Sequence, residues 1–261
     1  MKRLFSNGTF QSILWLICLL AVWELASVLG FVKPFLLPPF TTVITTLFQE
    51  LLRGRLIFQV LNSVSVILQG FVLSFVMSIV IALLCTWLMP VRRLFNLLCT
   101  IFNPLPAVAI MPLIIMWFGI SNGAMVAIIC HAVIWALLTH IISGFHAIPI
   151  VYREWSRNIG LSPYQTFTGV IIFSIMPDII AGIRVGWGRA WRALIGAEMV
   201  FGMIGSLGGL GYYIFTNRAY ANMPRVMAGV VVIIIIGIII ESVLFKQLEK
   251  HTVKKWGMVR E

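Results

Sequence analysis

Charged side chains are scarce in this sequence of 261 residues: aspartate, glutamate, lysine and arginine together supply only 10% of it. In an average soluble domain they supply about a quarter. A soluble domain of this length needs a polar shell that so few charges cannot provide, and 61% of the residues are hydrophobic. The composition therefore excludes a soluble enzyme and a disordered chain, and it indicates that lipid covers most of the surface.

Acidic residues and cysteines are scarcer still. The chain has eight acidic residues against 19 basic ones, a net charge of +11. The basic residues form short clusters between long apolar runs, which is typical of a membrane protein and argues against a nucleic-acid partner. The cysteines lie in apolar stretches without a CxxC pair, so we exclude a disulfide scaffold and predict buried free thiols. They are Cys18, Cys85, Cys99 and Cys130.

Catalytic groups are also missing. The chain has no Walker motif, and its few polar residues do not form a convergent acid, base or metal-binding set. His131 and His140 are nine residues apart and so lie on opposite sides of one helix, where they cannot share a metal ion. The glycine-rich segment 205–211 is not followed by the lysine of a phosphate-binding loop, and we interpret it as a turn. We therefore expect no catalytic residue, metal or cofactor in this chain.

Long apolar runs are what the chain has in abundance, and a membrane-spanning helix needs about 20 such residues. We predict an all-α integral membrane protein with six transmembrane helices in a single domain over 1–261. The segment 41–52 also has helix-like apolar spacing, which suits a helix lying along the membrane interface. The six predicted helices cover roughly 11–31, 63–89, 96–118, 124–146, 171–201 and 226–246.

The third predicted helix is interrupted. Its sequence Asn103-Pro104-Leu105-Pro106, followed by Pro112, breaks the backbone hydrogen bonds of a helix. Non-helical backbone at membrane depth is tolerated only where protein or a water-lined cavity covers it. We therefore expect the 96–118 helix to face the protein interior.

The distribution of basic residues predicts the orientation. With the N-terminus inside, ten basic residues fall on its side of the membrane and five on the other. The positive-inside rule then predicts a multi-pass protein of the cell membrane with both termini in the cytoplasm. The ten are Lys2, Arg3, Arg92, Arg93, Arg153, Arg157, Lys250, Lys254, Lys255 and Arg260, and the five are Lys33, Arg53, Arg55, Arg218 and Arg225.

The predicted cytoplasmic loop 149–170 contains the most informative short pattern. Ser162 is a good helix cap, Pro163 suits the first helical position, and Gln165 completes a capping box. Gly160 suits the end of a preceding helix. On that helix Glu154 and Arg157 are three residues apart, a spacing at which they can form an ion pair. The residues alone leave two interpretations open: a specialised corner of two short helices, or an ordinary connection between helices.

Because Glu154 lies six residues before Gly160 and an apolar run follows, this loop resembles the EAA loop of permease subunits in binding-protein-dependent ABC importers. In that family the short helix of the loop docks into a groove of the ATP-binding subunit and couples its closure to opening of the pore. Trp155 and Ser156 stand where alanines are usual, and Phe173 stands where a proline is usual. The resemblance implies ATPase-coupling roles for Glu154, Arg157, Gly160, Ser162, Pro163 and Tyr164.

Much of the remaining chain resembles the nitrate/sulfonate/taurine-type permeases of this class. The resemblance implies the fold of a type I ABC importer permease, with a second permease copy in a homodimer, two copies of an ATPase that binds ATP and Mg, and an extracytoplasmic substrate-binding protein. It implies import of a small anion such as a sulfonate, taurine or nitrate, although the subfamily also includes permeases for vitamin-precursor-like heteroaromatic compounds. The similar segments are Trp23–Leu25, Leu36–Pro39, Pro104–Gly119, Gly182–Arg184, Ala197–Met199 and Gly208–Tyr213.

A second class of transporter is the alternative. Six helices with an interrupted third one also suit a secondary transporter driven by an ion gradient. Many such transporters are built from two repeated halves, and no second half repeats the pattern in this chain. We therefore favour the ATP-driven importer.

The fifth predicted helix concentrates charges, each of which costs about 2.5–3.5 kcal/mol or more at mid-bilayer. At 100° per residue, Arg184, Arg189 and Arg192 fall within a wedge of roughly 140° and form one polar stripe. The stripe either lines the substrate path, where guanidinium groups bind oxyanions, or pairs with acidic residues and holds helices together. We expect Glu198 to pair with an arginine. The candidate translocation-path residues are Arg184, Arg189, Arg192 and Glu198.

Overall fold

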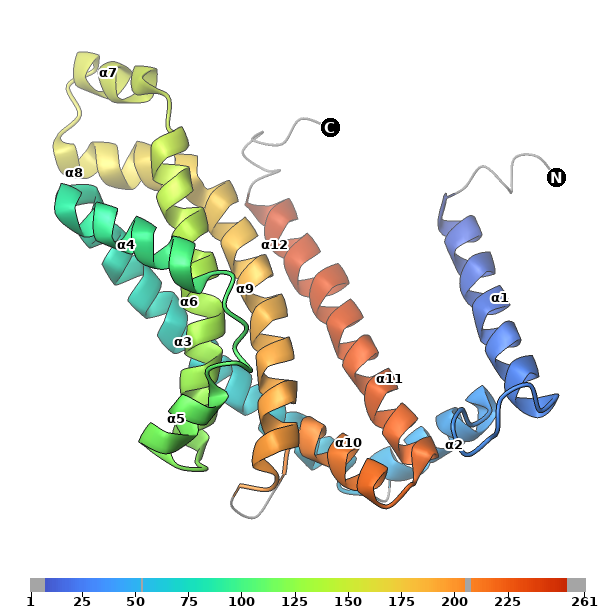
Figure 1. Cartoon of the computed structure of the whole chain (residues 1–261). Helices are drawn as coiled ribbons and strands as arrows, with labels where there is room; N and C mark the ends of the chain where they lie inside the picture. Colours follow the sequence, from blue (N-terminus) through green and yellow to red (C-terminus); the bar gives the residue numbers. More distant parts are fainter. Residues whose placement is uncertain (1–7, 53, 205–207, 253–261) are drawn as a thin grey trace.

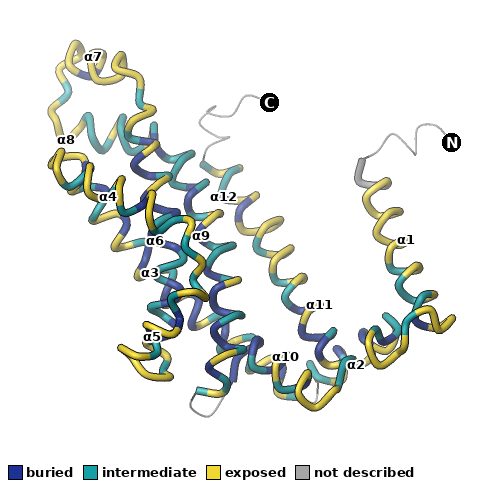
Figure 2. The backbone as a smooth tube through the Cα atoms, viewed as in Figure 1, coloured by how far each residue is buried: buried dark blue, intermediate teal, exposed yellow. Residues whose placement is uncertain are grey.

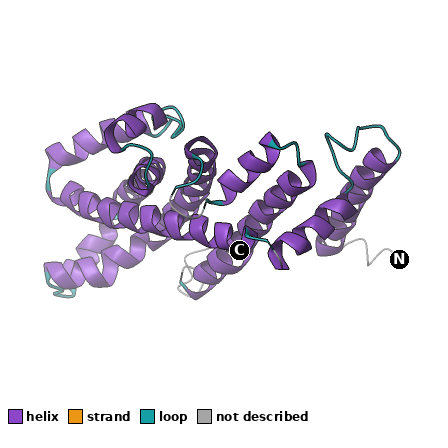
Figure 3. Cartoon of the chain, turned by 90° about the horizontal axis from the view of Figure 1, so that it is seen from below, coloured by secondary structure: helices purple, strands orange, loops and turns teal. Residues whose placement is uncertain are grey.

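The computed structural model describes residues 8–52, 54–204 and 208–252, and the regular elements in these ranges are all helices (Figure 1 and Figure 3). The predicted all-α fold is confirmed. Part of the glycine-rich 205–211 segment and six of the basic residues counted for the orientation lie outside the described residues. The elements are α1 Gly8–Val28, α2 Phe40–Leu52, α3 Leu56–Trp87, α4 Met89–Phe102, α5 Met111–Phe118, α6 Asn122–Ala147, α7 Ile150–Asn158, α8 Pro163–Thr166, the π-helical turn η1 Phe167–Ile171, α9 Ile172–Phe201, α10 Leu210–Ala219, α11 Met223–Ile239, the π-helical turn η2 Ile240–Phe245 and α12 Lys246–His251.

Five helical runs of the described chain are long and apolar enough to cross a membrane. They correspond to five of the six predicted helices, although α3 begins earlier than predicted, at Leu56. The predicted interfacial segment 41–52 is a separate helix, α2, which has the amphipathic pattern of a helix packed on one face. The five runs are Gln11–Val28, Leu56–Trp87, Asn122–Ala147, Pro163–Phe201 and Met223–His251.

The remaining predicted helix, 96–118, is not continuous. The structure divides it into α4, which ends at Phe102, and α5, which begins at Met111. These helices have 14 and 8 residues, and each is too short to span a bilayer, which takes about 20. The prolines at 104 and 106 account for the division, because each removes a backbone donor. The predicted break is therefore confirmed. The 96–118 segment is two short helices and not one continuous helix, and its crossing of the membrane as a sixth span stays a prediction.

The main bundle consists of α3, α6 and α9. Helix α6 packs against both of the others, and its Ile128 and Leu137 are fully buried together with Leu194 of α9. Helices α3 and α6 approach so closely that a Cβ added at Gly70 would lie 2.7 Å from the Cβ of Ile129. Small residues of this kind let membrane helices pack backbone against side chain. The core thus depends on a glycine at this crossing.

A second layer joins α2, α10 and α11 to the start of α3. Their shared core includes Val43, Leu56 and Leu210, and an ion pair of 2.9 Å links Glu50 of α2 to Arg225 of α11. Helices α2 and α10 and the start of α11 lie beside the lower end of the main bundle, from which α11 runs up to α12 (Figure 1). This layer therefore gives the molecule a broad, packed end away from α7 and α8.

Helix α1 stands apart from the bundle and contacts α2. The indole nitrogen of Trp23 donates to the carbonyl of Pro38 at 3.0 Å, and Glu24 accepts from the backbone and hydroxyl of Thr41 at 3.1 and 2.8 Å, so that it caps α2. Among the described side chains of α1 only Ser27 is buried, and Figure 2 shows the helix exposed along its length. Its apolar surface is available to lipid or to another chain.

The two ends of the molecule differ in content. Helices α7, α8 and α12 and the first described turn of α1 lie at one end, whereas α2, α5 and α10 lie at the other (Figure 1). The start of the described chain and its end therefore share one side with the 149–170 loop, as the predicted topology requires. That this side faces the cytoplasm stays a prediction.

The crossing at Gly70 gives a test of the packing. We expect Gly70→Ala to destabilise the chain by about 1–3 kcal/mol, because the added methyl group overpacks the contact with Ile129. Thermal unfolding of the detergent-purified protein measures the effect. Gly237→Ala is the matched control: a Cβ there meets no atom within 4 Å, and alanine favours the helix, so its melting temperature is expected to equal or exceed that of the parent. Equal melting temperatures for the two variants would contradict the prediction.

Candidate functional site: a basic cavity and a helical corner

A cavity of about 280 Å³ lies where the non-helical segment between α4 and α5 passes α9. Arg189 and Arg192 line it from α9, and Asn103 begins the segment that forms the facing wall. One side of the interrupted segment therefore lies against α9, whereas Pro104, Pro106 and Val108 are exposed, so the prediction that protein covers this backbone stays a prediction. The other lining residues are apolar or prolines and include no carboxylate: Pro104, Leu105, Pro106, Ala107, Val108, Ala132 and Ala193.

The two arginines at this cavity have different surroundings. A guanidinium nitrogen of Arg189 donates to the side-chain oxygen of Asn103 at 2.6 Å and to its carbonyl oxygen at 3.3 Å. This contact ties the interrupted segment to α9 and satisfies a carbonyl that the end of α4 leaves open. Arg192 is exposed at the same cavity and forms no hydrogen bond or ion pair with a described residue. In this cavity the charge of Arg189 is therefore held in place by Asn103, whereas the charge of Arg192 beside it is available to a ligand.

Arg184 lies away from this cavity. Its guanidinium group forms ion pairs with Glu241 of η2 and, at 3.1 Å, with Glu249 of α12. The structure therefore brings together only two of the three predicted stripe arginines. Arg184 instead joins α9 to the C-terminal helical run near the end that carries α7 and α8 (Figure 1).

Glu198 is 1% exposed and has no arginine partner within the described residues, so the expected pairing with an arginine is wrong. Its carboxylate accepts from the hydroxyl of Ser63 at 2.6 Å and from the backbone N–H of Gly211 at 2.7 Å. The Ser63 oxygen in turn accepts from the N–H of Leu210 at 2.8 Å. Glu198 thus satisfies donors at the start of α10, where a helix has unpaired N–H groups and favours negative charge. Ser63 lies 135 residues from Glu198, so no local pattern in the sequence indicates this partner.

The corner between α7 and α8 has the local geometry that the sequence predicts. Gly160 has φ of +74°, a left-handed conformation that glycine adopts without strain. Ser162 accepts from the N–H of Gln165 at 3.2 Å while the Gln165 side chain accepts from the N–H of Ser162 at 2.9 Å, and Pro163 occupies the first turn. The capping box and the glycine corner are confirmed. Glu154 and Arg157 are exposed on α7, but they form no ion pair with each other.

This corner also exposes apolar side chains. Tyr164 is 77% exposed and Trp155 57% exposed, and Ile150, Val151 and Ile159 are exposed beside them. Neighbouring exposed apolar residues on a polar end of a protein are typical of a surface that another protein covers. Sequence reasoning identified Tyr164 but not the contribution of Trp155, which stands in place of a small residue.

Metal-binding side chains do not gather in the described ranges: no group of three histidine, cysteine or acidic side chains lies within reach of one ion. The Nδ1 of His131 accepts a hydrogen bond from the indole N–H of Trp135 at 3.1 Å, and the imidazole ring packs against Phe102. This contact assigns the tautomer, because an indole nitrogen can only donate. All four cysteines are free thiols. Cys85 and Cys99 are buried as predicted, whereas Cys130 is half-buried and Cys18 is exposed on α1, so the prediction of buried thiols is wrong for these two. His131, Cys85 and Cys99 therefore take part in packing.

The interrupted helix, the arginine-lined cavity and the exposed corner define an integral membrane transport protein. The chain belongs to the family of binding-protein-dependent transport system inner membrane components, whose profile matches residues 74–254. A putative ABC transporter permease protein of Methanocaldococcus jannaschii is 30% identical over 84% of this chain and 82% of its own length. The putative aliphatic sulfonates transport permease protein SsuC of Bacillus subtilis is 25% identical over 95% of this chain and 88% of its own. The taurine transport system permease protein TauC of Escherichia coli is 26% identical over 90% and 86%.

The buried contacts of Glu198 give a second test. We expect Glu198→Ala to destabilise the chain by about 2–4 kcal/mol, because it leaves the Ser63 hydroxyl and the Gly211 N–H buried without an acceptor. Glu198→Gln keeps the shape and one acceptor oxygen, so a smaller loss is expected. Thermal unfolding in detergent measures both variants. If alanine and glutamine lower the melting temperature equally, the carboxylate does not act through these hydrogen bonds.

Proposed function

We propose that this chain is the permease subunit of an ATP-driven importer that moves a small anion, such as a sulfonate, taurine or nitrate, into the cytoplasm. The observation that carries the proposal is the cavity in which Arg189 and Arg192 lie beside the interrupted helix without a carboxylate. The names of two relatives, which refer to aliphatic sulfonates and to taurine, support this substrate class.

The two arginines have distinct roles in this proposal. Arg189 is held by Asn103 and keeps the α4–α5 segment in place. Arg192, which has no partner in the described chain, contacts the oxyanion. A guanidinium group offers two parallel N–H donors to a sulfonate or nitrate, and it stays charged at any physiological pH. Because the remaining lining of the cavity is apolar or proline and adds no second charge contact, the anion is held weakly enough to pass on.

The assembly follows from the family to which the chain belongs. We propose a homodimer of this chain with two copies of a separate ATPase, which binds ATP and Mg, and with an extracytoplasmic substrate-binding protein that selects the solute. The α7–α8 corner faces the cytoplasm together with both termini and docks on the ATPase. Glu154, Arg157 and Tyr164 supply exposed polar and aromatic contacts there, while Gly160, Ser162 and Pro163 hold the corner in shape.

The corner transmits the nucleotide state. ATP binding draws the two ATPase copies together, and the docked corners of the two permease copies move with them. The movement reaches the cavity because α8, η1 and α9 form one helical run, Pro163–Phe201. The pore then opens outward to receive the anion, and hydrolysis resets it.

Anion uptake tests the role of the cavity. We expect Arg192→Gln to lower uptake of a sulfonate about tenfold or more in proteoliposomes that contain the ATPase and the binding protein, because one charge-assisted hydrogen bond contributes about 1.5–3 kcal/mol. Arg93→Gln removes an equal charge from an exposed position on α4 and is expected to leave uptake unchanged. Uptake of the sulfonate by Arg192→Gln at the parental rate would refute the assignment.

ATP hydrolysis tests the corner. We expect Gly160→Pro to abolish substrate-stimulated hydrolysis, because proline requires φ near −65° and this position has +74°. Glu154→Lys, which reverses a charge on the exposed face of α7, is expected to do the same. Gly169→Ala is the control: a Cβ there meets no atom within 4 Å, and the backbone is helical. Normal stimulation in both corner variants would show that the ATPase docks elsewhere.

A further inference from the structure

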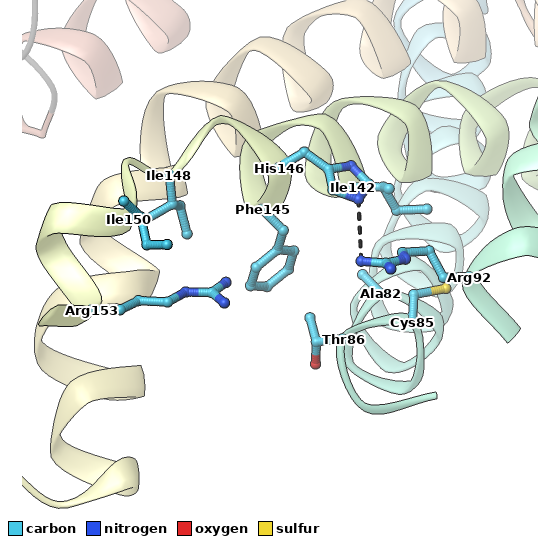
Figure 4. A pocket seen from close by; sticks show the side chains of 10 residues that line it. All are labelled: Ala82, Cys85, Thr86, Arg92, Ile142, Phe145, His146, Ile148, Ile150 and Arg153. Atoms are coloured by element: carbon cyan, nitrogen blue, oxygen red, sulfur yellow. Dashed lines mark hydrogen bonds between the residues drawn. The ribbon is translucent and has the colours of Figure 1, made fainter. Parts of the chain in front are cut away.

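A second cavity, of about 330 Å³, lies at the end of the bundle that carries α7 and takes no part in the proposed transport path. Four elements form its walls, α3, α4, α6 and α7, and Figure 4 shows it from close by. Its lining is basic and apolar and contains no carboxylate. The lining residues are Ala82, Cys85, Thr86, Arg92, Ile142, Phe145, His146, Ile148, Ile150 and Arg153.

Two arginines reach this cavity from different helices. The side chains of Arg153 on α7 and Arg92 on α4 extend toward one another, with the ring of Phe145 between them (Figure 4). A guanidinium nitrogen of Arg92 lies 3.3 Å from Nε2 of His146, and another donates to the sulfur of Met89 at 2.8 Å. Neither contact supplies negative charge. Arg153 has no hydrogen bond or ion pair with any residue in the described ranges.

The electrostatics therefore favour an anion. Positive groups that converge without a counter-charge repel one another, and an oxyanion between them removes the repulsion and accepts their N–H groups. A phosphate group suits the site, because its oxygens match the planar donor fork of each guanidinium group. The hydroxyl of Thr86 also lines the cavity, but its one proton is donated to the carbonyl of Leu83, so the donors for an anion are the two arginines.

The surroundings favour a phosphate that carries apolar chains. Next to the cavity, the corner between α3 and α4 exposes Trp87, Leu88 and Met89, with Trp87 77% exposed. Tryptophan is enriched where a membrane helix meets the interface. Below this corner, the outer faces of α3 and α4 expose Leu84 and Leu97. If the headgroup of a lipid enters the cavity, its acyl chains can pack on this apolar surface of α3 and α4.

We propose that this cavity binds the phosphate group of an anionic phospholipid, with Arg92 and Arg153 as its donors. Basic pockets between membrane helices at the interface hold anionic headgroups through such contacts. A free phosphate ion offers the same oxygens but no chains for the α3–α4 corner. A bound headgroup bridges α7 to α4 and so fixes the base of the exposed corner against the bundle.

Lipid binding to the purified full-length chain tests the proposal. Native mass spectrometry in a mild detergent compares phosphatidylglycerol, phosphatidylcholine and inorganic phosphate. We expect phosphatidylglycerol to bind more tightly than phosphatidylcholine, and Arg92→Gln and Arg153→Gln each to weaken it about fivefold. Arg93→Gln and Arg157→Gln are the matched controls, because they remove equal charge from the same two helices at positions outside the cavity lining. Their lipid affinity is expected to equal that of the parent.

Three outcomes would overturn the proposal. Phosphatidylglycerol affinity that is equal in the cavity variants and their controls would place the lipid elsewhere. Binding of inorganic phosphate that depends on both arginines, without a preference for phosphatidylglycerol, would assign the cavity to a free ion. Unchanged lipid affinity combined with weaker binding of the ATPase subunit would assign the arginines to an acidic group of that protein. If Arg92→Gln fails to fold because it loses the contacts with His146 and Met89, Arg153→Gln still tests the proposal, because the Arg153 side chain makes no such contact in the described chain.

Discussion

Polar groups in a bilayer must find partners within protein, and this requirement decides where the few charges of the chain lie. Glu198 is buried because the start of α10 and Ser63 supply three linked hydrogen bonds. Arg189 sits at membrane depth because the interrupted α4–α5 segment offers it two oxygens of Asn103. In each case a charged side chain and an irregular piece of backbone satisfy each other, and neither would be stable in the membrane alone.

The three arginines of α9 share one helix but not one role. Arg184 is neutralised by acidic groups of the C-terminal helical run, Arg189 supports backbone, and Arg192 is left without a partner in the described chain. A charge that the fold leaves unsatisfied beside a cavity is a stronger indication of ligand binding than a charge alone. The same reasoning applies at the end of the bundle that carries α7, where Arg92 and Arg153 line one cavity without a carboxylate.

The features that the sequence predicts well are those decided by neighbouring residues. The apolar runs give the long helices, the prolines at 104 and 106 give the break, and Ser162 with Gln165 gives the start of α8. The partner of Glu198 was not predictable in this way, because Ser63 lies 135 residues away and approaches only after α3 and α9 have packed. Arg184 likewise pairs with Glu241, which lies 57 residues away in η2 and reaches it only in the folded chain. Spacing on one helix places a side chain on a face, but it does not say which other element that face meets.

The continuous run from Pro163 to Phe201 has a mechanical consequence. Figure 1 shows it turning between α8 and α9. Pro177 lies near the start of α9, and a proline inside a helix bends it. In the proposed cycle, a sideways displacement of α8 rotates the part of α9 that follows Pro177 about this bend. The helix rises about 22 Å from Pro177 to Arg192, so a rotation of about 8° about the bend displaces Arg192 by roughly 3 Å. That is the length of one hydrogen bond, so a rotation of this size would break a contact between the Arg192 guanidinium group and the anion proposed for the cavity.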